Sequence, residues 1–179
     1  MSDISSMSVF QTFVNEVSGD HADFTGGTSA QKLESSSLKY ESKVPQLEYM
    51  CLMMENMVIK KKMKAVVYAG FQKLSRAEAI MDRYLEMAET ADIYIFGEND
   101  KKLPDHPNIT YVHLPKNAEL MKEWFLVIDG PAFKSMMVAQ DQDGFGTKAV
   151  EEDRHFKGVK SSSPGSVKKA VSLLEGAVS

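Results

Sequence analysis

The chain has 179 residues, 43% of them hydrophobic, and a formal net charge of -4 at pH 7. This length allows one well-filled core but not two large domains, and the acidic balance argues against nucleic acid as a partner, because phosphate binding needs clustered Lys and Arg. The single Cys51 excludes an intrachain disulfide, the N-terminus lacks the pattern of a signal peptide, and no apolar run approaches the roughly 20 residues of a membrane span. We therefore expect a cytoplasmic protein that binds neither nucleic acid nor membrane.

Residues 1–42 are predicted to form an N-terminal helix and a flexible arm. Apolar residues recur at helical spacing in residues 8–17, with Ser5, Ser6 or Ser8 available as the N-cap. Residues 18–42 are rich in Gly, Ser, Thr and charge, which predicts a long loop or partly ordered arm. We place a domain boundary between residues 42 and 43.

Residues 43–179 are predicted to form a single α/β domain, beginning with a helix over residues 44–62. The apolar stripe of this helix is broad, and three lysines follow it at the end that the helix dipole favours for cations. The residues of the stripe are Val44, Leu47, Met50, Cys51, Met53, Met54, Met57 and Val58. We expect this methionine-rich helix to be largely buried, with an adaptable partner-binding surface as the alternative use of its methionines.

Compact apolar runs predict the strands of a sheet over residues 63–69, 92–97, 109–114, 124–129 and 133–139. The last two strands flank Gly130 and Pro131, a spacing that suggests a hairpin. Ser75 and Glu78 form an S-x-x-E capping box, which predicts a helix running to about Ala91.

The C-terminal third is predicted to contain a Gly- and Asp-rich loop over residues 141–153, a segment at 154–160 that is consistent with an edge strand, and a closing helix. Ser163 and Pro164 mark the start of that helix. The resulting fold class is α/β, with a mixed five- or six-stranded sheet flanked by helices.

No motif for a cofactor, a metal or covalent catalysis is found. Neither G-x-x-x-x-G-K-[ST] nor G-x-G-x-x-G occurs, and the four histidines are scattered. Asp141, Asp143, Gly146 and Glu152 fall on ligand and glycine positions of a calcium loop, but Phe145 occupies the place of another ligand. We expect an ordinary turn there and predict no cofactor and no metal.

Several segments in order resemble the DICT sensory domain, which is named for its association with diguanylate cyclases and two-component systems. They are AGFQKLSRAEAIMDRYLEMAETADIYIFG, ITYVHL, LMKEWFLVIDGPAFKSMMVAQD and RHFKGVKSSSPGSV, and together they extend over most of residues 9–174. The short matches include a Gly70-Phe71-Gln72 turn, Arg83-Tyr84, Glu123-Trp124-Phe125, and Arg154 with Phe156. KSSS departs from the family pattern, which more often has an aromatic-rich strand end.

The resemblance implies a signalling input module without enzymatic activity, often fused to histidine kinase or cyclase output domains and connected with light-related responses. This chain carries no kinase or GGDEF-type motif. Its signal is therefore expected to pass through contact with a signalling protein such as a histidine kinase or cyclase, or with a second copy in a homo-oligomer. A signal would shift the balance between two packings of the helices on the sheet.

The predicted ligand- or partner-binding residues are Phe71, Gln72, Arg83, Tyr84, Glu123, Trp124, Arg154 and Phe156. They are of the types that form a polar rim over an apolar pocket, with aromatic rings for stacking. A simpler explanation accounts for the same residue types: an Arg that pairs with Glu across a sheet edge, and a Trp that seals the core.

Two other functions remain open. One is a small-molecule enzyme with a site assembled from Glu123, Asp129, Arg154 and His155, which requires these groups to converge in a cleft. The other is a structural subunit that dimerises through the methionine-rich helix.

Overall fold

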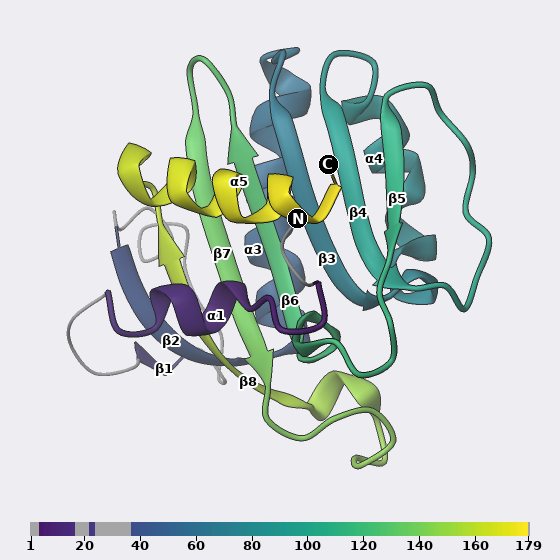
Figure 1. Ribbon diagram of the computed structural model, residues 1–179, viewed down its shortest axis with the longest axis vertical. Helices are drawn as coiled ribbons and strands as arrows, with labels where there is room; N and C mark the ends of the chain where they lie inside the picture. The colour runs from purple at the N-terminus through teal and green to yellow at the C-terminus, as the bar shows by residue number, and fades with distance from the viewer. Residues whose placement is uncertain (1–3, 17–21, 24–36, 179) are drawn as a thin grey trace.

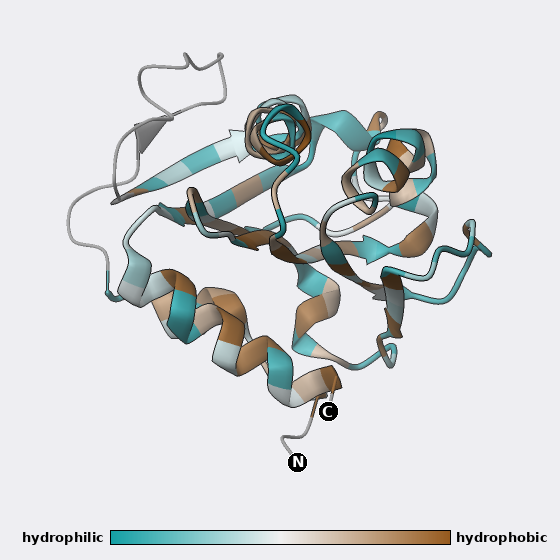
Figure 2. Ribbon diagram, turned by 90° about the horizontal axis from the view of Figure 1, so that it is seen from above, coloured by the Kyte–Doolittle hydropathy of each residue, from teal (hydrophilic) through white to brown (hydrophobic). Residues whose placement is uncertain are grey.

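The computed structural model describes residues 4–16, 22–23 and 37–178. A mixed sheet forms the middle of three layers, with helices on both of its faces (Figure 1, Figure 2). α1 and α5 cover one face, and α3 and α4 cover the other.

The helices are α1 (Val9–Phe13), α3 (Val44–Lys60), α4 (Met81–Met87) and α5 (Pro164–Val178), with the 3-10 helices η1 (Leu74–Ile80), η2 (Glu119–Lys122) and η3 (Glu151–Asp153). The strands are β1 (Ala22–Asp23), β2 (Ser37–Lys43), β3 (Val66–Lys73), β4 (Asp92–Glu98), β5 (Ile109–His113), β6 (Glu123–Asp129), β7 (Lys134–Asp141) and β8 (His155–Ser161).

The sheet has eight strands within the described residues, in the order β1-β2-β8-β7-β6-β3-β4-β5. β3, β4 and β5 are parallel to one another, whereas β6, β7, β8 and β2 each run antiparallel to the preceding strand, starting from β3. β3 is therefore the border between a parallel and an antiparallel half. The predicted α/β class and mixed sheet are confirmed, as is the hairpin of β6 and β7.

The prediction of five or six strands is too low, because β2 lies in a segment that we expected to be a loop. Leu38 and Tyr40 are its apolar residues, and Tyr40 is fully buried. Pairing with β8 along its whole length stabilises this polar strand, so β8 is an interior strand and not the edge strand predicted. Most of the predicted arm, residues 18–21 and 24–36, lies outside the described residues, as does Val17 at the end of the predicted N-terminal helix. The proposed boundary after residue 42 stays a prediction.

Alternation along the central strands divides the core into two apolar layers. Trp124, Leu126 and Ile128 of β6 face α3 and α4, while Phe125 and Val127 face α1 and α5. Both faces are covered, which explains why this strand reads as a continuous apolar run.

Gly70 lies inside β3, where we had predicted a turn. A Cβ atom at this position would lie 2.2 Å from Phe125 Cε1, so the ring occupies the space where a side chain would be. The strand continues to Lys73, and the chain leaves the sheet only there.

Two helix starts are explained by different local contacts. Pro45 is in the first turn of α3, and the Gln46 side chain accepts the Lys43 N–H at 2.8 Å. The predicted capping box at Ser75 is wrong, since both its N–H and its hydroxyl bond to Asp100. The segment after β3 consequently starts as the 3-10 helix η1, and α4 follows it.

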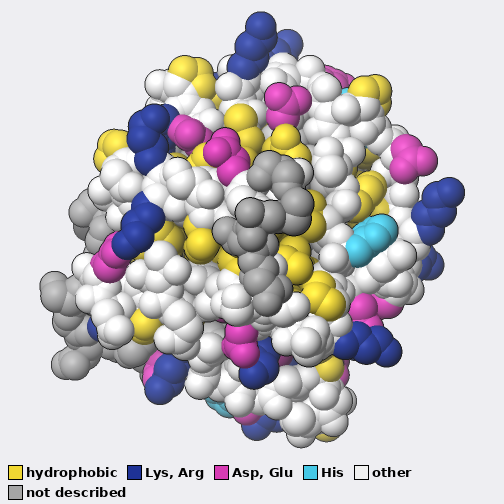
Figure 3. Space-filling model, in the orientation of Figure 1, with side chains coloured by type: hydrophobic (Ala, Val, Ile, Leu, Met, Phe, Trp, Pro, Cys, Tyr) yellow, Lys and Arg dark blue, Asp and Glu magenta, His cyan; other side chains and the backbone are white. Residues whose placement is uncertain are grey.

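The helices of the described part are all too short or too polar to cross a membrane. On the face shown in Figure 3, acidic and basic side chains are interspersed around hydrophobic atoms, and no basic patch is visible on it.

Candidate functional site

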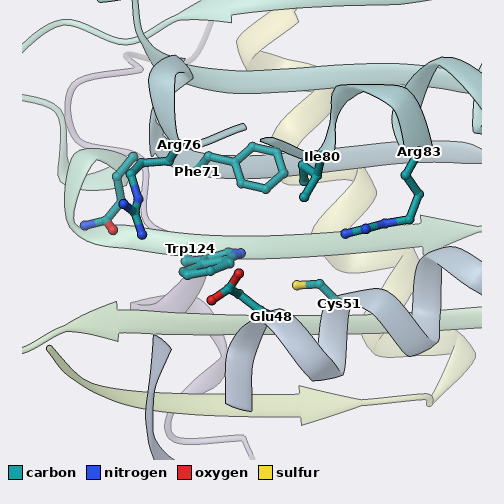
Figure 4. A pocket seen from close by; sticks show the side chains of 8 residues that line it. Glu48, Cys51, Phe71, Arg76, Ile80, Arg83 and Trp124 are labelled. Atoms are coloured by element: carbon teal, nitrogen blue, oxygen red, sulfur yellow. The ribbon is translucent and has the colours of Figure 1, made fainter. Parts of the chain in front are cut away.

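A small cavity lies at the carboxyl end of β3, where the chain leaves the sheet to form η1. Its volume is about 50 Å³. In open α/β sheets, ligands bind beyond the carboxyl ends of the strands where the strand order changes, and β3 borders the parallel half of this sheet. The cavity is lined by Glu48, Cys51, Phe71, Gln72, Arg76, Ile80, Arg83 and Trp124 (Figure 4).

Gln72 has a strained backbone conformation at one wall of this cavity. Its φ is 67°, in the left-handed region, and the register between β3 and β4 shifts at this point. Its amide Nε2 donates to Met121 O and to Asp141 Oδ2, both at 3.1 Å, and its Oε1 accepts from Arg154 Nη1 at 3.1 Å. These hydrogen bonds hold the bulge, because such strain persists only where the surroundings determine it.

Arg154 is a fully buried cation beside this bulge. Its Nη1 donates to Asp141 Oδ2 at 2.5 Å, and its Nε lies 2.9 Å from Glu151 Oε2. The guanidinium carbon lies 4.0 Å from the ring centroid of Phe145 and 5.3 Å from that of Phe156. This cluster ties the loop between β7 and β8 to the sheet.

A second buried charge, Glu55 of α3, joins α3 to α4. Its Oε1 accepts from Arg83 Nε at 2.7 Å, and its Oε2 accepts from the Tyr84 hydroxyl. Burial raises the pKa of Glu55, and its two partners partly offset that rise. Because Nε is held in this way, the rest of the Arg83 guanidinium extends toward the cavity, as Figure 4 shows.

Trp124 and Cys51 form the inner wall of the cavity. The indole is 8% exposed, and its Nε1 has no hydrogen-bond acceptor within the described part of the chain. Burial raises the pKa of the Cys51 thiol well above its ordinary value; the charge of Glu55 adds to this rise, and the indole N–H opposes it. The N–H therefore faces the sulfur, but a thiol is a weak acceptor and the geometry does not reach a hydrogen bond.

The structure places most of the predicted binding residues in this region. Those that line the cavity are Phe71, Gln72, Arg83 and Trp124. Three others lie directly behind the wall: Tyr84 bonds to Glu55, Arg154 bonds to Gln72, and Phe156 packs edge-on against Trp124 with 6.1 Å between ring centroids. That these residues bind a ligand or partner stays a prediction.

Glu123 is the predicted binding residue that does not lie near the cavity. It is fully buried beneath α1, on the opposite face of the sheet. Its Oε1 accepts the N–H groups of Val9 and Phe10, each at 2.9 Å, and its Oε2 accepts the Ser8 hydroxyl. Burial raises the pKa of Glu123 to about 7, although these hydrogen bonds oppose the rise. Because α1 occupies this carboxylate, Glu123 is not a partner of Arg154. Within the described residues Arg83 pairs with Glu55, and Arg154 pairs with Glu151.

Sequence reasoning did not identify Glu48, Arg76 and Ile80 as lining residues, and it assigned Cys51 only to the core. Cys51 is buried as predicted, but it also reaches the cavity. Helical spacing was the available signal, because Glu48 and Cys51 are three residues apart and Arg76 and Ile80 are four apart. Which helix face meets the cavity depends on how η1 and α4 pack, and no local pattern records that.

The structure does not assemble the enzyme site considered above, which required Glu123, Asp129, Arg154 and His155 to converge. Glu123 lies beneath α1, and Asp129 forms an ion pair at the other end of β6. His155 is exposed, and its backbone N–H donates to Asp143 Oδ2 at 2.7 Å.

The calcium-like loop uses its carboxylates within the protein. Asp141 Oδ1 accepts the N–H groups of Asp143 and Gly144, at 3.1 and 2.8 Å. Among the described residues, no group of three or more His, Cys, Asp or Glu side chains is placed to hold a metal ion.

A second hollow lies on the other flank of α3, and we call it the methionine groove. It has a volume of about 320 Å³ and is lined by Met50, Met53, Met54, Met57, Phe133, Ser135, Lys160 and Ser162. Burial lowers the pKa of Lys160 in its wall. α3 is therefore a shared wall, with the cavity on one flank and the methionine groove on the other.

Comparison with solved structures shows likeness of fold. Part of the polyphosphate kinase from Porphyromonas gingivalis is similar at a TM-score of 0.51 and 13% identity, over 86% of this chain and 25% of the kinase. The chain thus spans a quarter of that protein's length. NucT from Helicobacter pylori has a TM-score of 0.42 and 13% identity, over 79% of this chain and 96% of NucT. No curated protein matches the sequence significantly.

The sequence profile of one family matches residues 28–142, which is more than half of the chain. That family is described as "Sensory domain in DIguanylate Cyclases and Two-component system". The match includes α3, β3, η1, α4 and β6, which supply the cavity-lining residues. The chain therefore belongs to the DICT family of sensory domains.

Proposed function

We propose that the chain is a non-catalytic sensory module of the cytoplasm that signals by contact with a separate protein. The partner would be a histidine kinase or a diguanylate cyclase, in a two-component or cyclic-di-GMP pathway. In this proposal the cavity receives the cue, and the methionine groove is the surface that contacts the partner.

One observation carries the proposal, namely that α3 borders both hollows. Glu48 and Cys51 of α3 line the cavity, while Met53 and Met57 of the same helix line the methionine groove. A ligand that favours one position of α3 would change the shape of the groove, and a partner that fits one shape better would read that change. Thioether side chains suit such a surface because they repack easily.

The proposed occupant of the groove is an amphipathic helix of the partner, with acidic residues beside its apolar stripe. Lys60, Lys61 and Lys62 follow the groove at the end of α3, are exposed, and make no ion pair within the described residues. Such lysines would attract an acidic segment and orient it along α3.

The test measures binding of the purified chain to a purified histidine kinase or diguanylate cyclase of the same organism by calorimetry. The variant Met53→Gln/Met57→Gln should lower the affinity at least tenfold, since apolar contact would be lost. Tyr49→Gln is the matched control, because Tyr49 is exposed on α3 outside the groove. Circular dichroism would show that each variant remains folded.

Equal affinity of the double variant and the wild type would overturn the assignment of the groove. Light scattering distinguishes the structural alternative: a dimer that the double variant dissociates would mean that a second copy occupies this surface. Turnover of a small metabolite by the purified chain would instead support the enzyme alternative.

The light-related role is tested separately. The cavity of about 50 Å³ is far smaller than the 300–1,000 Å³ of typical sites for drug-sized ligands, so it does not suit a chromophore. An absorption band in the visible range from protein purified from its natural host would support a light cue, with the pigment bound elsewhere.

A further inference from the structure

We propose that the cavity beside Trp124 binds a small carboxylate of two or three carbons, whose oxygen atoms accept hydrogen bonds from Trp124 and Arg83. This inference rests on the proposed sensory function, because it names the class of ligand for the input site of that function.

The first reason is an unused donor at the inner end of the cavity. Trp124 Nε1 is buried and has no acceptor among the described residues. Leaving a buried N–H unpaired costs about 1–3 kcal/mol, so such groups usually have a partner. An oxygen atom placed in the cavity, where the N–H faces Cys51, would supply that partner.

The second reason is the fixed guanidinium of Arg83. Its Nε is bonded to the buried Glu55, and its terminal nitrogens make no hydrogen bond within the described part of the chain. Figure 4 shows this group extending toward Trp124 from the opposite side of the cavity. A carboxylate is the ligand that suits the planar fork of a guanidinium best.

Two buried acceptors at the cavity, Gln72 in its lining and Glu55 behind it, are already occupied, which argues against a donor-rich ligand. Glu55 accepts from Arg83 and Tyr84, and Gln72 Oε1 accepts from Arg154. Glu48 also lines the cavity, and Figure 4 shows its carboxylate beside Trp124, but Arg76 and Arg83 in the same lining outnumber it. Apart from Glu48, the free hydrogen-bonding groups of Trp124 and Arg83 are donors, so a ligand that pairs with them must bring acceptors.

The size of the cavity limits the ligand. About 50 Å³ is room for only a small ligand, since a cavity needs at least about 10–15 Å³ to hold a single water. Acetate and propionate fit this limit, with their methyl groups against Phe71 and Ile80.

The experiment uses the fluorescence of Trp124, the single Trp of the chain. The full-length protein is titrated with sodium acetate and sodium propionate at constant ionic strength, beside the neutral acetamide and the cationic methylammonium. We expect a saturable change with the two carboxylates, at a Kd of roughly 0.1–10 mM for so few atoms, and none with the controls.

Variants locate the binding. Arg83→Lys retains a cation for Glu55 but loses the fork, and should weaken acetate binding about tenfold. Trp124→Phe retains the ring but loses the N–H, and calorimetry should show a similar loss. Lys122→Gln removes an exposed cation that does not line the cavity, and should leave acetate binding unchanged.

The outcomes separate this inference from the function on which it rests. Equal or stronger binding of acetamide would overturn the carboxylate assignment while leaving the cavity as an input site. No saturable change with any probe would overturn the inference, and the partner measurement with the groove variants would then decide the sensory proposal by itself. Undiminished acetate binding in both Arg83→Lys and Trp124→Phe would place the ligand elsewhere and also overturn it.

Discussion

The two faces of the sheet differ in the buried charged groups that they contain. The face under α3 and α4 contains the Glu55 and Arg154 clusters, a cavity and a groove. The face under α1 and α5 is an apolar layer in which the carboxyl of Glu123 anchors α1. Polar groups and empty volume therefore gather on the face where we place the sensory function, whereas the opposite face serves to complete the core.

The largest expected effect concerns Arg154. Arg154→Ala leaves Asp141 in the interior without its cation, and should lower the free energy of unfolding by roughly 3–5 kcal/mol in urea titrations. Lys157→Ala, at an exposed position of the adjoining strand β8, is the control. A loss below about 1 kcal/mol for Arg154→Ala would show that this face does not depend on buried charge. The double variant Arg154→Met/Asp141→Leu should recover most of the loss, since the buried charge of Asp141 is removed as well and Glu151, the remaining partner, is partly exposed.

Glu123 tests the opposite face through pH. Its pKa of about 7 in the fold exceeds the ordinary value of 4.5, so between these values the folded state holds a proton that the unfolded state releases. The contribution of Glu123 to the free energy of unfolding should therefore fall as pH rises from about 4.5 to 7, by up to about 3 kcal/mol.

Glu123→Gln should abolish this fall, because the amide oxygen can accept the N–H groups of Val9 and Phe10 without a charge. Glu119→Gln should retain most of it, since Glu119 makes only a minor contribution to the raised pKa of Glu123. Thermal unfolding at a series of pH values measures both. Parallel pH profiles of wild type and Glu123→Gln would contradict the assignment.

Tyr84→Phe sharpens the comparison within the α3 and α4 face. It removes a hydrogen bond to the buried Glu55, which should cost roughly 2 kcal/mol and raise the pKa of Glu55 further. Tyr111→Phe removes a hydroxyl that bonds to a carbonyl in a more exposed place, and should cost less. Urea unfolding measures the loss of stability in both variants. Equal losses would mean that a hydrogen bond to the buried carboxylate stabilises the fold no more than one to a neutral carbonyl.

The smallest effect is expected at the surface of the other face, where Lys169 of α5 pairs with Glu16. Both side chains are about half exposed, so Lys169→Ala should lower stability by roughly 0.2–1 kcal/mol, and less in high salt. A loss as large as that of Tyr84→Phe would mean that this pair fixes the turn after α1 to α5 more strongly than exposed pairs do.

Sequence reasoning predicted the strongly apolar elements well, because the apolar residues that cause their burial lie within the elements themselves. α3 and the strands from β4 to β7 were recognised in this way. β2 was not, since only Leu38 and Tyr40 are apolar in it and its stability comes from pairing with β8. The capping box at Ser75 failed because Asp100, from a distant loop, provides a competing acceptor.

The candidate site was predictable in its residue types more than in its contacts. Phe71, Arg83 and Trp124 were expected to bind a ligand, and they do line one cavity. The partners of Arg154 could not be predicted, because their identity depends on the bulge at Gln72 and on the register of three strands. Neither of these is visible in a local pattern.

The anchoring of α1 by Glu123 has a consequence for the synthesis of the chain. Val9 and Glu123 are 114 residues apart, so the segment of α1 leaves the ribosome long before its acceptor has been made. A five-residue helix is not stable in isolation. Its amphipathic segment must therefore remain undocked until β6 has joined the sheet, and during translation its apolar side chains are available to chaperones.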